Sequence, residues 1–204
     1  NAKVTKKSKS PLSFHPIALI FGLLSFVSYL VEGAVGDWSA LYLFEDKGIV
    51  IEEAVMGVML FNGTMCIGRL LGNRLGKHLT SKQVVVGGYL LGSIAMGLIV
   101  FLPGHASMYI YLLLGISLAM IVPNLFSAMG EQNVIPMTQA VATSTMLGYM
   151  GILMGPALIG FIAHGTSLTV AFIVLTTLLV VSAGIGKYAY HLMSKDCGLS
   201  EEQI

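Results

Sequence analysis

Charged residues are scarce in this chain of 204 residues. Lys, Arg, Asp and Glu together make up 10% of it, 55% of the residues are hydrophobic, and the mean hydropathy is +0.84. Soluble domains carry roughly 25% charged residues, and a soluble fold of this length would need a charged surface that this composition cannot supply. The scarcity of charge therefore indicates an integral membrane protein.

Other features are scarce or missing, and each excludes a class of function. The two cysteines are too few for a disulfide framework, and a net charge of +1 gives no electrostatic field to attract nucleic acid. The five histidines lie near predicted helix ends without the spacing of metal ligands, and the chain has no glycine-rich phosphate loop and no catalytic set of side chains. We therefore expect no enzyme activity, no metal or cofactor, and no nucleic-acid partner.

Long apolar runs are what the chain does contain. A bilayer core about 30 Å thick requires roughly 20 apolar residues per helix. Six segments meet that requirement, at about 16–43, 53–75, 83–103, 107–130, 137–163 and 166–191. We predict an all-α membrane protein with a six-helix bundle over 16–192, a basic cytoplasmic segment over 1–15, and a cytoplasmic tail over 193–204.

The distribution of basic residues predicts the orientation. With six spans, both termini and the loops 76–82 and 131–136 share one side, and ten of the eleven Lys and Arg residues fall on or near it. Only Lys47 falls on the other side. Short cytoplasmic loops carry an excess of Lys and Arg, so we predict that both termini are cytoplasmic.

Glycine is abundant, with 24 residues, and recurs inside two of the predicted helices. The positions are Gly57, Gly63, Gly68 and Gly72 in the second helix and Gly148, Gly151, Gly155 and Gly160 in the fifth. Small residues let helix backbones approach one another closely, so we expect these two helices to be the closely packed ones. Pro123 and Pro156 should bend the fourth and fifth helices.

The stretch "EGAVGDWSAL", residues 32–41, places two acids near the end of the first apolar run. At a rise of 1.5 Å per residue, Glu32 lies roughly 24 Å and Asp37 about 31 Å from Pro16. We therefore expect Glu32 in the outer third of the hydrocarbon core. Asp37 and Trp38 should lie at the outer interface, Trp38 as an aromatic anchor.

Glu32 continues a polar stripe along one face of the first helix. The stripe consists of Ser25, Ser28, Tyr29, Glu32 and Gly36, which share one helix face. A carboxylate at membrane depth usually faces a bundle interior or a water-filled cavity. Glu32 is therefore a candidate for binding a proton or a cationic or hydroxylated substrate. The alternative is that Glu32 bonds a neighbouring helix and fixes its packing.

The fourth helix has a comparable stripe, made of Ser117, Met120, Asn124 and Ser127. Asn124 follows Pro123, and amides beside freed carbonyls bind polar substrates in broken transporter helices. Ser117 and Asn124 are therefore further candidates for substrate binding. The alternative is that Asn124 satisfies the gap left by the proline.

Three stretches together resemble the major facilitator superfamily of transporters. "GRLLGNRLGKHL", residues 68–79, is similar to its loop motif, roughly Gly-x-x-x-Asp-Arg-x-Gly-Arg-Lys, with Arg74, Gly76 and Lys77 matching and Asn73 in place of the aspartate. "GYMGILMGPALIGFIA", residues 148–163, resembles the eleventh helix of a bacterial branch related to sugar and drug porters, and "EGAVGDWSALYL" resembles the same branch. The substitution by Asn73 removes one ion pair from the expected cytoplasmic latch.

The resemblance implies the C-terminal six helices of a twelve-helix transporter, built as a 3+3 inverted repeat. It implies that the first and fourth helices line a central cavity and that loop 68–82 and Glu131 act at a cytoplasmic gate. The expected function is secondary active transport of a small polar or amphipathic solute across a bacterial inner membrane, coupled to protons. The expected partners are the lipid bilayer, the solute, protons and the N-terminal half. The alternative is a self-contained six-helix channel or membrane scaffold.

Overall fold

A computed structural model describes residues 12, 15–75 and 79–197, and for 73–75, 196 and 197 it describes the backbone alone. Every regular element in this part of the chain is a helix. The elements are α1 (Pro16–Glu45), α2 (Ile51–Leu75), α3 (Ser81–Phe101), α4 (Gly104–Ala119), α5 (Ile121–Glu131), α6 (Met137–Gly165) and α7 (Leu168–Cys197).

Six of the helical stretches in the described residues are long and apolar enough to cross a membrane, because α4 and α5 together form the fourth. The predicted all-α fold with six spans is therefore confirmed. The helix ends differ from the predicted ones by a few residues, and α7 continues to Cys197.

The fourth span is interrupted at Met120 (φ −101°, ψ −4°) rather than bent at Pro123. Pro123 has no N–H for the carbonyl four residues earlier, that of Ala119, and its ring crowds that carbonyl. α4 therefore ends at Ala119, and Pro123 lies in the first turn of α5, where an N–H has no helical partner. Asn124 stabilises the break, because its Nδ2 donates to the Met120 carbonyl oxygen at 2.8 Å.

α6, by contrast, continues through Pro156 as one helix. The carbonyl that Pro156 leaves without a helical partner is that of Ile152. It points at Gly33 of α1, where a Cβ atom would lie 2.9 Å from the Ile152 oxygen. The absence of a side chain at Gly33 therefore lets α1 pack directly on the altered turn of α6.

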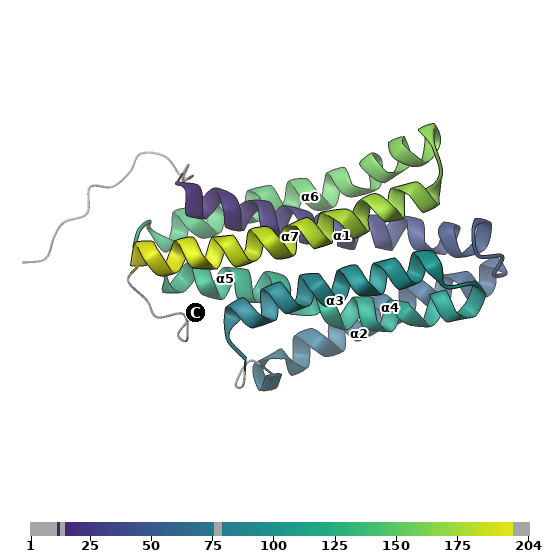
Figure 1. Cartoon of the computed structure of the whole chain (residues 1–204), viewed down its shortest axis with the longest axis horizontal. Coiled ribbons are helices and arrows are strands. Elements are labelled where there is room, and N and C mark those ends of the chain that lie inside the picture. The colour runs from purple at the N-terminus through teal and green to yellow at the C-terminus, as the bar shows by residue number, and fades with distance from the viewer. Residues whose placement is uncertain (1–11, 13–14, 76–78, 198–204) are drawn as a thin grey trace, which may run out of the picture.

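The helices run along a common direction, and their connections alternate between the two ends of the bundle (Figure 1). Three contacts join the connections at one end: Lys47 to the α3 terminus, Glu53 to His105 at 2.7 Å, and Thr169 to Asp46 at 3.1 Å. α1 begins and α7 ends at the opposite end (Figure 1). The two described ends of the chain therefore share one side of the bundle.

Lys47 closes the carboxyl end of α3. Its Nζ donates to the carbonyl oxygens of Val100 at 2.6 Å and Leu102 at 2.9 Å, and lies 5.3 Å from the centroid of the Tyr42 ring. Burial lowers the pKa of the Lys47 ammonium, and the neighbouring Asp46 carboxylate opposes that change. A cation at a helix C-terminus is stabilised by the unpaired carbonyls and by the helix dipole.

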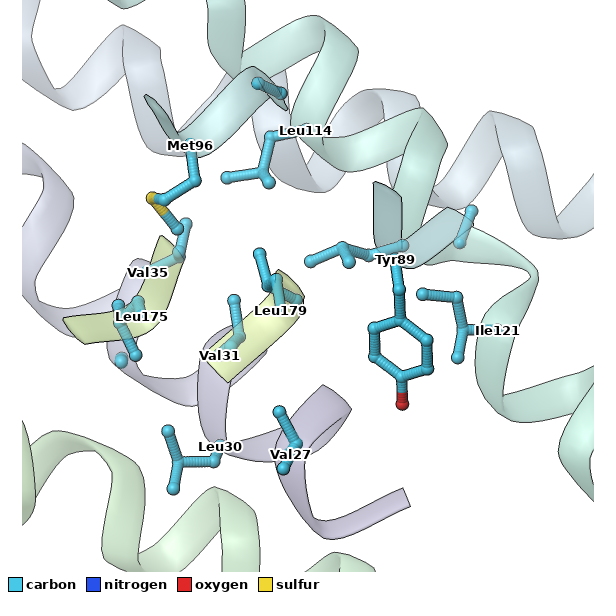
Figure 2. Close-up of a cluster of buried hydrophobic side chains, with 14 of the residues drawn as sticks. Val27, Leu30, Val31, Val35, Tyr89, Met96, Leu114, Ile121, Leu175 and Leu179 are labelled. Atoms are coloured by element: carbon cyan, nitrogen blue, oxygen red, sulfur yellow. The ribbon is translucent and has the colours of Figure 1, made fainter. Parts of the chain in front are cut away.

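The buried core lies around α1. Figure 2 shows side chains of α1, α3, α4, α5 and α7 meeting there, and the labelled residues include none from α2 or α6. α2 and α6 instead expose long apolar side chains on their outer faces, such as Leu70 at 76% and Leu153 at 77% exposure. α2 and α6 therefore expose more large apolar side chains than any other described helix of the bundle.

Glycine allows α2 and α6 each to pack closely on one neighbour. A Cβ atom at Gly151 of α6 would overlap the Phe26 carbonyl oxygen of α1, and one at Gly68 of α2 would lie 2.6 Å from the Ala119 Cβ of α4. In the described residues, no Cα of α2 lies within 8 Å of a Cα of α6. The two glycine-rich helices are thus closely packed as expected, each on a different partner.

This pairing has the symmetry of an inverted repeat. The first span packs on the fifth and the fourth packs on the second, while the third packs on the sixth. Exchanging the first three spans with the last three converts the first of these pairs into the second and leaves the third unchanged. The shared glycines of α2 and α6 therefore reflect equivalent positions in the two repeats.

Candidate functional site

An ion pair joins α1 to α2 within the membrane-spanning segments. Arg69 Nη2 donates to Glu32 Oε1 at 3.0 Å and to Oε2 at 3.1 Å. The Glu32 side chain is 11% exposed and that of Arg69 is 43% exposed. A charge at membrane depth is costly unless it is paired or hydrated, and here each side chain supplies the counter-charge of the other.

A pair of tyrosines lies one helical turn from the ion pair. The rings of Tyr29 in α1 and Tyr149 in α6 are parallel to within 3°, with centroids 6.3 Å apart. Gly148 makes room for this arrangement, since a Cβ atom there would lie 2.6 Å from Tyr29 Cδ2. Tyr149 is 63% exposed and lines an open cavity of about 620 Å³ along the first half of α6.

The side chains of Tyr29 and Glu32 lie on one surface of α1, and their partners Tyr149 and Arg69 lie beside it. Tyr29 contacts α6 on one flank, and Glu32 contacts α2 on the other, while α2 and α6 remain apart. The site therefore offers aromatic faces, a carboxylate, and a guanidinium on a partly exposed side chain. This combination suits a ligand that has both an apolar part and polar groups.

Sequence reasoning predicted Tyr29 and Glu32 but missed Arg69 and Tyr149. Arg69 counts among the ten basic residues on or near the predicted cytoplasmic side, although it lies inside the second apolar segment. A cation inside an apolar run, with a carboxylate inside a neighbouring one, is the signal that could have revealed the pair. Tyr149 lies in the stretch 148–163, and the family resemblance of that stretch assigns the tyrosine no role.

The two serines of the α1 stripe are fully buried. Tyr89 of α3 donates to the Leu24 carbonyl oxygen at 2.7 Å, so its hydroxyl hydrogen is used, and Ser28 must donate to the Tyr89 oxygen at 2.9 Å. Ser25 donates to the Phe21 carbonyl oxygen one turn back, at 3.0 Å. The structure therefore places Ser28 between α1 and α3, while Tyr29 and Glu32 lie at the surface of α1.

Trp38 and Asp37 differ in their surroundings. Trp38 Nε1 donates to the Pro156 carbonyl oxygen of α6 at 2.9 Å, and its ring lies beside Gly160. It also lines a cavity of about 390 Å³ that reaches Asp46 at the end of the bundle. Asp37 is exposed.

The candidates of the fourth span face α3. Ser117 is buried and donates to the Leu114 carbonyl oxygen at 2.7 Å, and a Cβ atom at Gly92 of α3 would lie 3.2 Å from its Oγ. Asn124 bonds the Met120 carbonyl oxygen, and Ser81 Oγ of α3 lies 3.4 Å from its Oδ1. The structure does not bring these two residues into contact with Glu32, and Asn124 fills the gap at the helix break.

Part of the predicted gate lies outside the described residues. This is so for Gly76 and Lys77, and for the side chains of Asn73 and Arg74 in the last turn of α2. Glu131 is exposed and ends α5, at the same end of the bundle as Pro16. Within the described ranges, no group of three or more His, Cys, Asp or Glu side chains is placed to hold a metal ion.

No protein-family model matches the chain. Individual proteins do match the chain, and one of these matches shows the family to which it belongs. The chain is 41% identical over 168 residues to an uncharacterized MFS-type transporter of Yersinia pestis, where MFS stands for major facilitator superfamily, and the match covers 81% of the chain and 43% of that protein. The chain belongs to the major facilitator superfamily.

Two further relatives extend the match. The chain is 30% identical over 170 residues to the membrane protein MosC of Rhizobium meliloti and 28% identical over 159 residues to the uncharacterized transporter y4wD of Sinorhizobium fredii. The matches cover 82% and 76% of the chain but 42% and 41% of these proteins. This major facilitator chain is thus a multi-pass membrane protein that spans less than half the length of the relatives it matches.

Proposed function

We propose that the chain is the C-terminal six-helix half of a secondary active transporter in a bacterial inner membrane, with both described ends on the cytoplasmic side. The observation that carries the proposal is the Glu32–Arg69 ion pair beside Tyr29 and Tyr149, within membrane-spanning helices. Relatives named as transporters support a transport role over catalysis. The proposed cargo is a small polar or amphipathic solute.

The ion pair gives this site a way to couple solute binding to a proton. Protonation of Glu32 removes its negative charge and weakens its hold on Arg69. The Arg69 guanidinium then becomes free to bind an acceptor group of the solute, whose apolar part lies against the tyrosine rings. Because the solute and the carboxylate compete for the same guanidinium, the protonated and ionised forms of the site differ in solute affinity, as coupling requires.

Alternating access would move this bundle against an N-terminal half. The apolar outer faces of α2 and α6 are the surfaces proposed to contact that half. Asn73, Arg74, Gly76, Lys77 and Glu131 are proposed to close the cytoplasmic side. Ser28 and Asn124, which contact Tyr89 and Ser81 of α3, are proposed to hold α1 and the broken fourth span in place behind the site. Ser25 and Ser117 bond carbonyls of their own helices there.

The alternative function is a channel or scaffold formed by six helices alone. The two proposals differ in the size of the native gene product. A mass roughly twice the 21.7 kDa of this chain supports a half-transporter. A product of about 21.7 kDa would favour the channel or scaffold.

The transport proposal is tested with the full-length native protein in proteoliposomes containing a pH indicator. Candidate solutes are first screened for those that make an imposed pH gradient decay faster. Glu32→Gln should then abolish solute-linked proton movement while solute exchange between the two sides continues. Glu45→Gln, at the exposed end of α1, is the matched control and should behave as the wild type. Normal proton movement in Glu32→Gln would remove Glu32 from the coupling mechanism.

A further inference from the structure

A cavity of about 640 Å³ opens between α3 and α7, away from the proposed solute site. Its lining residues come from the first turns of α3 and from one position of α7. They are Thr80, Lys82, Gln83, Val86, Gly87, Leu90 and Lys187. The polar members cluster at the start of α3, and the apolar members follow along the same helix.

The two lysines approach the cavity from different helices at nearly the same depth. α3 and α7 are antiparallel neighbours, and a Cβ atom at Gly186 would lie 3.6 Å from Val86 Cγ2. Lys187 is therefore level with the first turns of α3, where Lys82 lies. α3 begins toward the end of the bundle at which α7 ends (Figure 1), and Lys187 lies ten residues before that end of α7.

The polar groups at the start of α3 add hydrogen-bond donors. Thr80 and Gln83 form a capping box in which Thr80 Oγ1 accepts from the Gln83 backbone N–H and Gln83 Oε1 accepts from the Thr80 backbone N–H. The side-chain Nε2–H groups of Gln83 take no part in this box, in which its side chain uses only Oε1. Two ammonium groups and an amide donor are the chemistry that binds a phosphate.

The remainder of the cavity is an apolar groove at the membrane-facing surface. Leu90 is 47% exposed, and a Cβ atom at Gly87 would meet no atom within 4 Å. A soluble phosphate would leave this groove uncovered, whereas an acyl chain would fill it. Basic pockets between membrane helices near a membrane surface bind the head groups of anionic lipids.

We propose that this cavity binds an anionic phospholipid of the surrounding bilayer. The lipid phosphate lies between Lys82 and Lys187, and one acyl chain lies along Val86, Gly87 and Leu90. The lipid would thus bridge α3 and α7, the third and sixth spans. The proposed lipid site does not depend on which solute the protein carries.

The test is native mass spectrometry of the full-length protein in detergent, titrated with phosphatidylglycerol or with phosphatidylcholine of the same acyl chains. Two changes probe the two parts of the site: the Lys82→Gln/Lys187→Gln double variant for the head group, and Gly87→Leu for the groove. Their controls are Lys195→Gln and Gly184→Leu. Both control positions lie on α7 outside the cavity, and Gly184 also has room for a side chain.

We expect the wild type and both controls to retain phosphatidylglycerol in preference to phosphatidylcholine. The double lysine variant should bind phosphatidylglycerol roughly 25-fold more weakly, since each of the two basic residues near the anionic head group contributes about fivefold in affinity. Gly87→Leu should weaken binding of both lipids, because its side chain fills the groove and leaves the lysines in place.

Three results would overturn the proposal. The first is equal retention of the two lipids by the wild type, and the second is wild-type affinity in both the double lysine variant and Gly87→Leu. The third is displacement of phosphatidylglycerol by an equal concentration of glycerol phosphate, which would show that the site takes a soluble anion. Gly87→Leu retains every charged group, so its result stands even where the double lysine variant does not fold.

Discussion

At the scale of single residues, the pairing of Glu32 with Arg69 offsets the free-energy cost of placing each charge at membrane depth. Either charge alone at membrane depth would be unfavourable by about 3 kcal/mol, and the partial exposure of Arg69 reduces that figure. The pair therefore stabilises α1 against α2 mainly by preventing an unpaired charge. A neutral pair of similar shape should serve the fold equally well, which separates the structural role of the pair from its proposed role in transport.

This separation predicts a non-additive double-mutant cycle. Glu32→Gln and Arg69→Gln should each lower the free energy of unfolding by up to about 3 kcal/mol, because each leaves one charge unpaired at membrane depth, whereas the double variant should recover most of that loss. Thermal unfolding midpoints of the four proteins in one detergent measure the coupling. The recovered double variant should still fail to move protons with solute. A double variant whose loss equals the sum of the two single losses would show that the residues do not interact.

Lys47 has a different role, since it bonds main-chain carbonyls rather than a carboxylate. Lys47→Met keeps much of the side-chain length but removes both bonds to Val100 and Leu102. We expect a loss of about 1.5–3 kcal/mol, as for a hydrogen bond made by a charged group, and a lower midpoint of thermal unfolding. Lys195→Met at the end of α7 is the matched control. An unchanged midpoint for Lys47→Met would mean that water replaces the ammonium without cost.

The sequence revealed one member of each charged contact but not its partner. Glu32 is conspicuous because a carboxylate inside an apolar run is rare and costly. The identity of its partner depends on which face of α2 meets α1. Arg69 lies near the end of the second apolar segment, so its sequence position is compatible with a loop as well as with a buried helix face. Lys47 was correctly set apart from the other basic residues, but nothing in the sequence shows that the end of α3 lies within its reach.

At the scale of helices, close packing depends on the absence of side chains at a few positions. A Cβ atom at Gly151 would overlap a main-chain carbonyl oxygen of α1, which cannot move without displacing the helix. Gly151→Ala should therefore separate α1 from α6 and cost about 1–3 kcal/mol. Gly63→Ala on α2 meets no atom within 4 Å and should leave stability unchanged or raise it slightly. Thermal unfolding in detergent compares the two, and equal midpoints would contradict this account of the α1–α6 contact.

The number, length and type of the helices followed from composition and apolar run length, because the bilayer fixes how long an apolar helix must be. The sequence predicted a bend at Pro123, whereas the fourth span is interrupted at Met120, since proline disturbs the carbonyl four residues before it. The spacing of glycines showed that α2 and α6 pack closely. It could not show their partners, because a glycine-lined face fits any neighbour of matching shape.

At the scale of the whole molecule, the bundle is asymmetric in what it exposes. Long apolar side chains of α2 and α6 lie outward on either side of the α1 surface that carries Tyr29 and Glu32. Apolar surface on a membrane protein can face lipid or another protein. A surface that also includes a partly exposed ion pair is a poor match for lipid hydrocarbon. The asymmetry therefore supports a second bundle seated on this face.

Tryptophan substitution distinguishes protein from lipid as the neighbour of these faces. A bulky ring is accommodated by fluid lipid but is costly in a packed interface, where added volume forces displacement. In the full-length protein, Leu70→Trp on α2 and Leu153→Trp on α6 should lower the unfolding midpoint and solute uptake. Ile94→Trp on α3 and Val181→Trp on α7, at positions of 58% and 52% exposure, are the matched controls and should be tolerated. Equal tolerance at all four positions would place lipid against α2 and α6, and the six-helix channel or scaffold would then explain the chain better than a half-transporter.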